Sequence, residues 1–135
     1  MAEPVTNYIT TDYITDQQLK VTAMATLLQD KIDLSTLALQ DYARKFDVQA
    51  DMISTDNPDY VVKQWCKNWV CAEMFTDLMG KNKGEDLQSD VYFQKYKLYD
   101  AKRSDFEMQI NYEVLTNTVF DSRARASNNS RTYRR

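Results

Sequence analysis

The sequence predicts an all-α protein, a small bundle of about four helices with an extended arm at each end. The chain has 135 residues, the size of one ordinary domain, and its 43% hydrophobic content can supply a core without metals or disulfides. It contains only two glycines, so tight hairpins and glycine-rich phosphate loops are hard to build. Apolar residues also recur at helical spacing through the middle of the chain. We therefore divide the chain into an N-terminal arm at 1–14, a helical domain at 15–115 and a C-terminal arm at 116–135.

The N-terminal arm is rich in Thr, Tyr and Ile up to about Tyr13, which favours an extended conformation. An uncovered extended segment of this kind invites docking on a neighbour. The first helical segment is predicted to begin where Thr15 and Gln18 form a capping box. Its inner residues would be Leu19, Met24, Leu27 and Leu28, followed by Leu34, Leu37, Ala38, Tyr42 and Phe46. Because Asp33 or Ser35 could cap a second helix, this stretch fits either two helices or one bent helix.

The third predicted helix carries the clearest boundaries in the chain. Asn57 and Pro58 combine a capping residue with a proline at the first helical position, and Gly80 supplies the stop. The apolar face between them is wide, with Val61, Trp65, Trp69, Ala72 and Phe75 along its centre and six more apolar residues beside it. A face of this width predicts contact on several sides, so we expect this helix at the centre of the bundle.

A fourth helix is expected to begin near Glu85 or Asp86, whose acids suit the positive end of the helix dipole, and to reach about Arg103. Residues 106–114 alternate like a strand but also fit successive helical turns. We expect the helix to continue to about Ile110 and an extended exit to follow. The predicted core consists of Trp65, Trp69, Phe75, Leu27, Leu28, Phe46 and Tyr96.

The composition argues against most enzyme classes. Without histidine, the chain lacks the commonest general base, the serine and cysteine protease dyads and every His-ligated metal site. Cys66 and Cys71 point about 140° apart on a helix, so they are expected to be two buried, reduced thiols. No pair of carboxylates stands out as an acid/base couple. We therefore expect a protein that is not an enzyme and that binds no cofactor or metal, with no signal peptide and no membrane span.

Charge is divided unevenly along the chain. Residues 1–121 hold 12 Lys and Arg against 20 Asp and Glu, a net charge of −8, whereas residues 122–135 hold five arginines and no acid. This arginine-rich arm has no aliphatic side chain larger than Ala, so it cannot form a core of its own. The arm could dock in acidic protein grooves, neutralise DNA phosphates or remain a solvated tail. The acidic body argues against specific DNA reading, because no predicted helix offers a basic face.

The order of these parts resembles the helical head-tail connector, or adaptor, family of tailed bacteriophages. The residues that carry the resemblance are YITDQQL at 13–19, DYARKF at 41–46, the helix that begins at Pro58, DVYFQKY at 90–96 and the arginine-rich exit. The resemblance spans most of the chain and includes no catalytic signature.

The resemblance implies a structural protein of the virion neck, made in the host cytoplasm and located at the head-tail interface. It implies a homo-oligomeric ring of about twelve copies, a dodecamer, joining the portal protein to the tail or to a second neck protein. Genomic DNA would pass through the channel without sequence-specific binding. Docking on the portal or an adjacent ring would use the C-terminal arm, with Arg123, Arg125, Arg131, Tyr133, Arg134 and Arg135 as the contact residues. The alternative function is a small nucleic-acid-binding regulator that uses the same arm.

Overall fold

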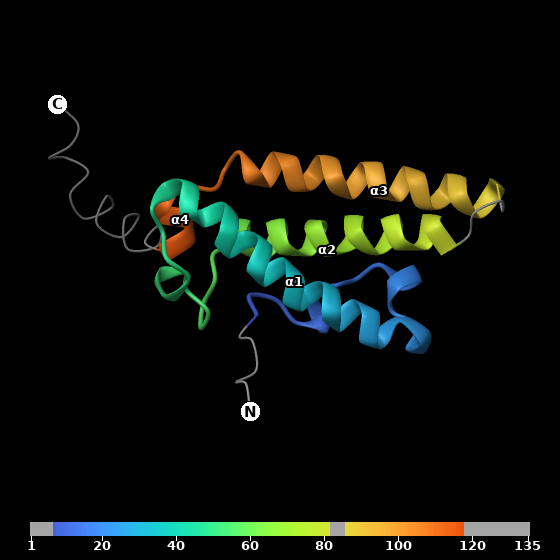
Figure 1. Ribbon diagram of the computed structural model, residues 1–135, viewed down its shortest axis with the longest axis horizontal. Helices are drawn as coiled ribbons and strands as arrows, with labels where there is room; N and C mark the ends of the chain where they lie inside the picture. Colours follow the sequence, from blue (N-terminus) through green and yellow to red (C-terminus); the bar gives the residue numbers. More distant parts are fainter. Residues whose placement is uncertain (1–6, 82–85, 118–135) are drawn as a thin grey trace, which may run out of the picture.

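The structure, a computed structural model, describes residues 7–81 and 86–117. These residues form four α-helices, α1 at Ala25–Ala43, α2 at Tyr60–Lys81, α3 at Asp86–Glu107 and the short α4 at Tyr112–Thr116, with 3-10 turns between them. No strand occurs in the described part of the chain, and the predicted all-α bundle is confirmed. Figure 1 shows α2 and α3 lying side by side along their length, with α1 crossing them obliquely and α4 at one end.

Helix α2 is the central helix, as its wide apolar face predicted. Both α1 and α3 pack against it, and Val62, Cys66, Val70 and Met74 are completely buried along its length. Its start lies two residues later than predicted, because the Asp59 carboxylate accepts the Val61 backbone N–H at 2.9 Å and takes the capping role expected of Asn57. Pro58 therefore lies outside the helix.

Helix α1 is one continuous helix, which settles the choice between one helix and two. Asp33 and Ser35 lie inside it and are not caps; the buried Ser35 hydroxyl donates to the Ile32 carbonyl at 2.7 Å. The predicted inward orientation of Leu34 and Leu37 is wrong, since these side chains are 47% and 52% exposed. Apolar residues form two stripes on this helix. The stripe that contains Leu34 and Leu37 is exposed, and the stripe formed by Leu28, Ile32, Leu39 and Ala43 is buried against the rest of the protein.

The core surrounds α2. Of the predicted core residues, Trp65, Phe75 and Leu28 are buried, while Leu27, Phe46, Trp69 and Tyr96 are partly buried against the same cluster. Phe75 is the largest of the fully buried side chains and stacks on the Tyr99 ring with a centroid separation of 5.9 Å. The aromatic residues of α2 and α3 thus join the two helices.

The N-terminal segment at 7–24 is part of the core. The prediction of an uncovered arm is wrong for residues 7–14, because Tyr8, Ile9 and Ile14 are buried. The capping box expected at Thr15 is also absent: the Asp16 carboxylate accepts the Gln18 backbone N–H at 3.0 Å instead and caps a 3-10 turn at Gln17–Leu19. The apolar side chains of this segment pack into the core formed by the helices, so the segment folds back onto the bundle.

The chain leaves α3 by a turn and not by a strand or an extended exit. Helix α3 ends at Glu107, and the Asn111 side chain accepts the Val114 backbone N–H at 2.9 Å and starts α4. The buried Val114 and Leu115 anchor α4, whose Leu115 carbonyl accepts the Ser54 backbone N–H at 3.3 Å. The apolar pattern of this segment fits both a strand and a helix, and capping by Asn111 determines that a helix begins here.

Candidate functional site

The sequence placed the docking site in the C-terminal arm. Its six contact residues, Arg123, Arg125, Arg131, Tyr133, Arg134 and Arg135, lie outside the described residues. The helical body itself offers three features to which a role can be attached: a groove between three helices, a buried carboxylate, and two exposed apolar faces.

The groove lies where α1, α2 and α3 approach one another, and its volume is about 430 Å³. It is lined by Ala38, Asp41, Tyr42 and Lys45 from α1 and the turn after it, Trp65 and Trp69 from α2, and Arg103 and Glu107 from α3. The Tyr42 and Trp65 rings stack at 6.4 Å, and the Lys45 ammonium lies 4.8 Å from the centre of the Tyr42 ring. The groove thus has aromatic walls and charged edges.

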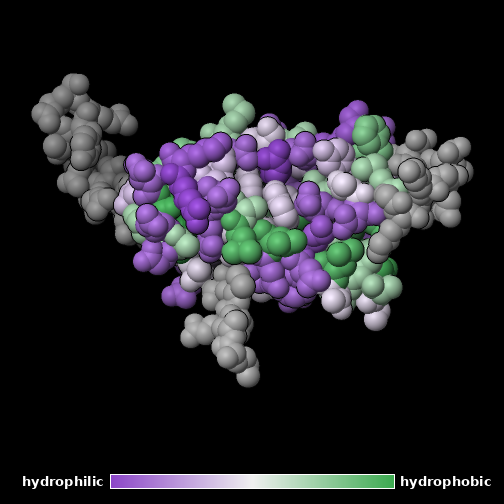
Figure 2. All heavy atoms as spheres, viewed as in Figure 1, coloured by the Kyte–Doolittle hydropathy of each residue, from purple (hydrophilic) through white to green (hydrophobic). Residues whose placement is uncertain are grey.

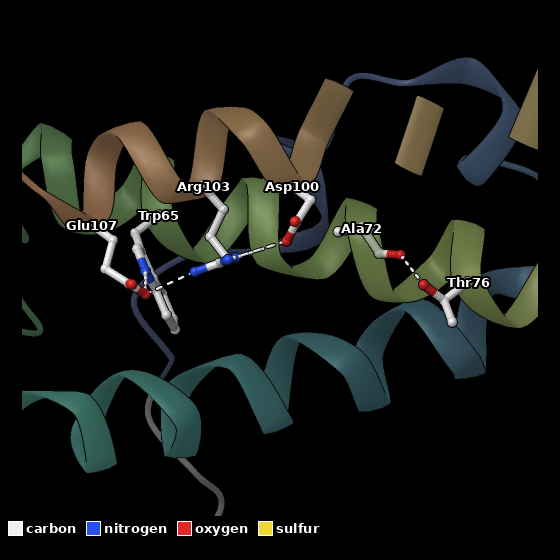
Figure 3. A network of polar contacts seen from close by, with 6 residues as sticks. All are labelled: Trp65, Ala72, Thr76, Asp100, Arg103 and Glu107. Atoms are coloured by element: carbon white, nitrogen blue, oxygen red, sulfur yellow. Dashed lines mark hydrogen bonds and ion pairs between the residues drawn. The ribbon is translucent and has the colours of Figure 1, made fainter. Parts of the chain in front are cut away.

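The charges of α3 in this groove are paired with one another (Figure 3). Arg103 donates to a Glu107 carboxylate oxygen at 2.7 Å and to Asp100 at 3.1 and 3.2 Å. The same Glu107 oxygen accepts the Trp65 indole N–H at 3.1 Å. Burial and the nearby Glu107 charge raise the pKa of Tyr42 above its ordinary value. Because Arg103 fixes the Glu107 carboxylate and this carboxylate accepts the indole N–H of Trp65 from α2, the arrangement holds α2 and α3 in register.

The second feature is the Asp16 carboxylate, whose side chain is only 4% exposed. One of its oxygens accepts the Tyr99 hydroxyl at 2.7 Å and the Lys95 ammonium at 2.9 Å, both from α3. Burial opposes ionisation of Asp16, but the hydrogen bonds from Tyr99 and Lys95 outweigh it and lower the pKa of the carboxyl. Burial and the hydrogen bond to this carboxylate raise the pKa of Tyr99.

The N-terminal segment also bonds to the other two helices. The Thr36 hydroxyl of α1 donates to the Asn7 side chain at 2.6 Å, and the Gln64 amide of α2 donates to the Tyr13 hydroxyl at 2.9 Å. Together with Asp16, these contacts fasten one segment to α1, α2 and α3, so it acts as a brace across the bundle.

The two cysteines are buried and unpaired, as predicted. Burial raises the pKa of both the Cys66 and the Cys71 thiol to about 12. A thiol with such a pKa holds almost no thiolate near neutral pH, so neither group is activated as a nucleophile.

The third feature is a pair of exposed apolar faces on the outer helices. On α1 the exposed large apolar residues are Leu34 and Leu37; on α3 they are Val91, Phe93 and Leu98. Figure 2 shows a hydrophobic patch in the middle of the face that α1 occupies, between hydrophilic surroundings. Leu34 and Leu37 are neighbours one turn apart on α1, and Val91 and Leu98 share one side of α3, whereas Phe93 lies on another side of that helix. Neighbouring exposed apolar side chains are typical of surfaces that contact another protein.

Comparison of the chain with protein-family models, with curated proteins and with solved structures finds no match. None of the helices in the described residues is both long enough and apolar enough to cross a membrane. Within the same residues, no three His, Cys, Asp or Glu side chains gather where they could hold a metal ion.

The sequence reasoning missed the brace and the charge cluster of α3. The i, i+4 spacing of Arg103 and Glu107 could have indicated their ion pair, since residues so spaced are neighbours on a helix. The contact of Asp16 with Lys95 and Tyr99 carries no such local signal, because the partners lie about 80 residues away along the chain.

Proposed function

We propose that this protein is a structural adaptor of a bacteriophage neck, present as a ring between the portal and the tail. The single observation that carries the proposal furthest is the pair of exposed apolar faces on α1 and α3. A ring subunit needs two different surfaces, one for each neighbour, and these two helices each pack against α2 and each carry exposed apolar side chains.

The charge division supports the same function. An acidic body around a channel repels DNA, so DNA slides through it without sticking. The five arginines of residues 122–135 suit an acidic groove on a portal, because guanidinium groups bind carboxylates bidentately. Ring assembly would multiply a weak contact of each arm, since one engaged copy raises the local concentration for the next.

Deleting residues 122–135 tests this function. The shortened chain should keep its helical circular dichroism and its own assembly state, but lose binding to the portal of the phage that encodes it. A matched control keeps the arm and replaces Asn128 and Asn129 by serine, which leaves all five arginines in place. If the shortened chain binds the portal as tightly as the full chain does, the arm has no docking role.

The alternative is a nucleic-acid-binding regulator, favoured by the net charge of +5 on residues 122–135. It predicts that affinity for free DNA or RNA falls steeply as salt rises, by close to one unit of logarithmic slope for each phosphate contact. A flat salt titration eliminates this alternative and leaves the adaptor function standing.

A further inference from the structure

The part of the N-terminal brace that crosses the bundle, residues 7–19, shares no backbone hydrogen bond with a helix in the described part of the chain. Its backbone hydrogen bonds stay inside the brace and its hinge, for example from the Ile14 N–H to the Thr11 carbonyl at 3.1 Å. Only side chains fasten it to α1, α2 and α3. Segments that share few hydrogen bonds with their surroundings open at a lower free energy than the core of a protein does.

A hinge of four residues joins the brace to α1. Residues 20–23 are all exposed, and the chain reverses its direction there before it enters the helix (Figure 1). Neither the 3-10 turn at Thr22–Met24 nor α1 begins with a side-chain cap. Leu19, Val21 and Leu28 line a pocket of about 200 Å³ beside the hinge. The hinge is therefore loosely packed, so its backbone torsions can change without moving the helices.

Two kinds of contact keep the brace closed. The Asp16 carboxylate joins it to α3, where the Lys95 ammonium and the Tyr99 hydroxyl both donate to one carboxylate oxygen. Apolar side chains of the brace are also buried in the core, namely Tyr8, Ile9, Ile14 and Leu19. Because Asp16 makes polar contacts, its removal weakens the closed form while the apolar contacts stay the same. We name Asp16 the latch.

Cys71 of α2 lies beneath the latch. Gln64, Lys67 and Cys71 follow one another at spacings of three and four residues, so they share one side of α2. The brace crosses this side, because the Gln64 amide donates to the Tyr13 hydroxyl at 2.9 Å and the Lys67 ammonium lies 5.8 Å from the centre of the Tyr13 ring. Burial, followed by the Asp16 charge, raises the pKa of the Cys71 thiol to about 12. The thiol is completely buried, so it becomes accessible only when the structure opens.

We propose that the brace opens by itself at the hinge while the three long helices stay packed, and that the Asp16 latch sets how often it opens. The open form exposes the Cys71 thiol and the side of α2 and α3 that the brace covers when it is closed. A partner that binds only the open form would shift the population toward it. This inference concerns the fold of a single chain and does not depend on the proposed neck function.

Alkylation of Cys71 by iodoacetamide in the folded, full-length chain measures this opening. Trypsin cleaves after Lys67, which lies between the two cysteines, so peptide mass spectrometry follows Cys71 separately from Cys66. With a slow reagent, the rate follows the equilibrium between the closed and open forms. Opening of the brace alone exposes little surface, so the rate should depend weakly on urea, whereas global unfolding followed by tryptophan fluorescence depends strongly on urea.

Three variants identify the opening element. Asp16→Ala should speed the labelling of Cys71 about 100-fold, because the bonds from Lys95 and Tyr99 exist only in the closed form. Tyr99→Phe removes one of these bonds and keeps the aromatic ring, so an increase of about tenfold is expected. Asp12→Ala, at an exposed position in the same brace, should leave the rate unchanged within about twofold.

A weak urea dependence together with both accelerations supports the separate opening. If the rate rises with urea as steeply as global unfolding does in every variant, the brace opens only with the whole protein and the inference is wrong. If the urea dependence is weak but Asp16→Ala and Tyr99→Phe label at the unchanged rate, Asp16 is not the latch and the inference is also wrong. If circular dichroism shows that Asp16→Ala is unfolded, Tyr99→Phe decides between these outcomes. None of them bears on the ring, which the portal-binding experiment tests.

Discussion

Replacing Asp16 by alanine removes the carboxylate that holds the N-terminal brace on α3. Three hydrogen bonds end on it, from Tyr99 at 2.7 Å, from Lys95 at 2.9 Å and from the Gln18 backbone at 3.0 Å. Hydrogen bonds to a charged group contribute about 1.5–3 kcal/mol each, and a capping bond about 1 kcal/mol. The Lys95 side chain is 34% exposed and regains water when its partner is lost. This discount brings the expected loss to about 3 kcal/mol in the free energy of unfolding.

Urea unfolding followed by tryptophan fluorescence measures this loss, and thermal unfolding should show a fall of about 10 °C in the midpoint. Asp12→Ala is the matched control, because Asp12 lies in the same segment with an exposed side chain; its effect should stay within about 0.5 kcal/mol. A loss below about 1 kcal/mol for Asp16→Ala would refute the view that this carboxylate fastens the segment to α3.

Four further measurements follow from the same structure. Folding lowers the pKa of Asp16, so the ionised carboxylate stabilises the folded protein above the unfolded pKa of about 3.8, and this stabilisation is lost as pH falls through the folded pKa. The difference in free energy of unfolding between the unchanged protein and Asp16→Asn should therefore become smaller as pH is lowered. A difference that stays constant with pH contradicts this. Phe75→Ala should cost about 3–5 kcal/mol in urea unfolding, against less than about 1 kcal/mol for Phe93→Ala on the surface. Cys66 and Cys71 should react with a thiol reagent slowly in the folded protein and rapidly in urea; equal rates would show that the thiols are accessible. Glu107→Gln keeps an acceptor for the Trp65 indole but loses the Arg103 ion pair, so it should cost about 1 kcal/mol and leave the tryptophan emission nearly unchanged, whereas Glu107→Ala should shift that emission.

The helices of this fold could be predicted where one feature of the sequence, such as a broad apolar face or a cluster of acids at the start, was unambiguous. The broad apolar face of residues 61–79 predicted the central helix, and the acids before residue 87 predicted the start of α3 at Asp86. The capping residues were less predictable, since Asp59 and Asp16 compete with neighbours of similar chemistry at Asn57 and Thr15. Only the packing decides between them.

The outer surfaces show why hydrophobic periodicity alone could not identify which side of a helix is buried. Helix α1 has leucines on two sides, and hydropathy cannot distinguish the side that meets the core from the side at Leu34 and Leu37 that meets solvent. The prediction of a free N-terminal arm is wrong because its few charges and many Thr and Tyr residues indicate only that the backbone is extended. They do not indicate whether the segment packs on the helices. Its burial depends on partners such as Thr36 and Gln64 that lie far away in the sequence. The arginines that the sequence predicts to dock on a partner lie outside the described residues, and their role stays a prediction.

The proposed adaptor role can be checked by measuring the mass of the complex that this chain forms with the portal protein of the proposed phage. If the chain forms the proposed ring, sedimentation velocity of the mixture should show a portal complex enlarged by a whole ring, with about one copy of this chain for each portal subunit. A chain that sediments alone at 15.8 kDa beside an unchanged portal would contradict the adaptor function.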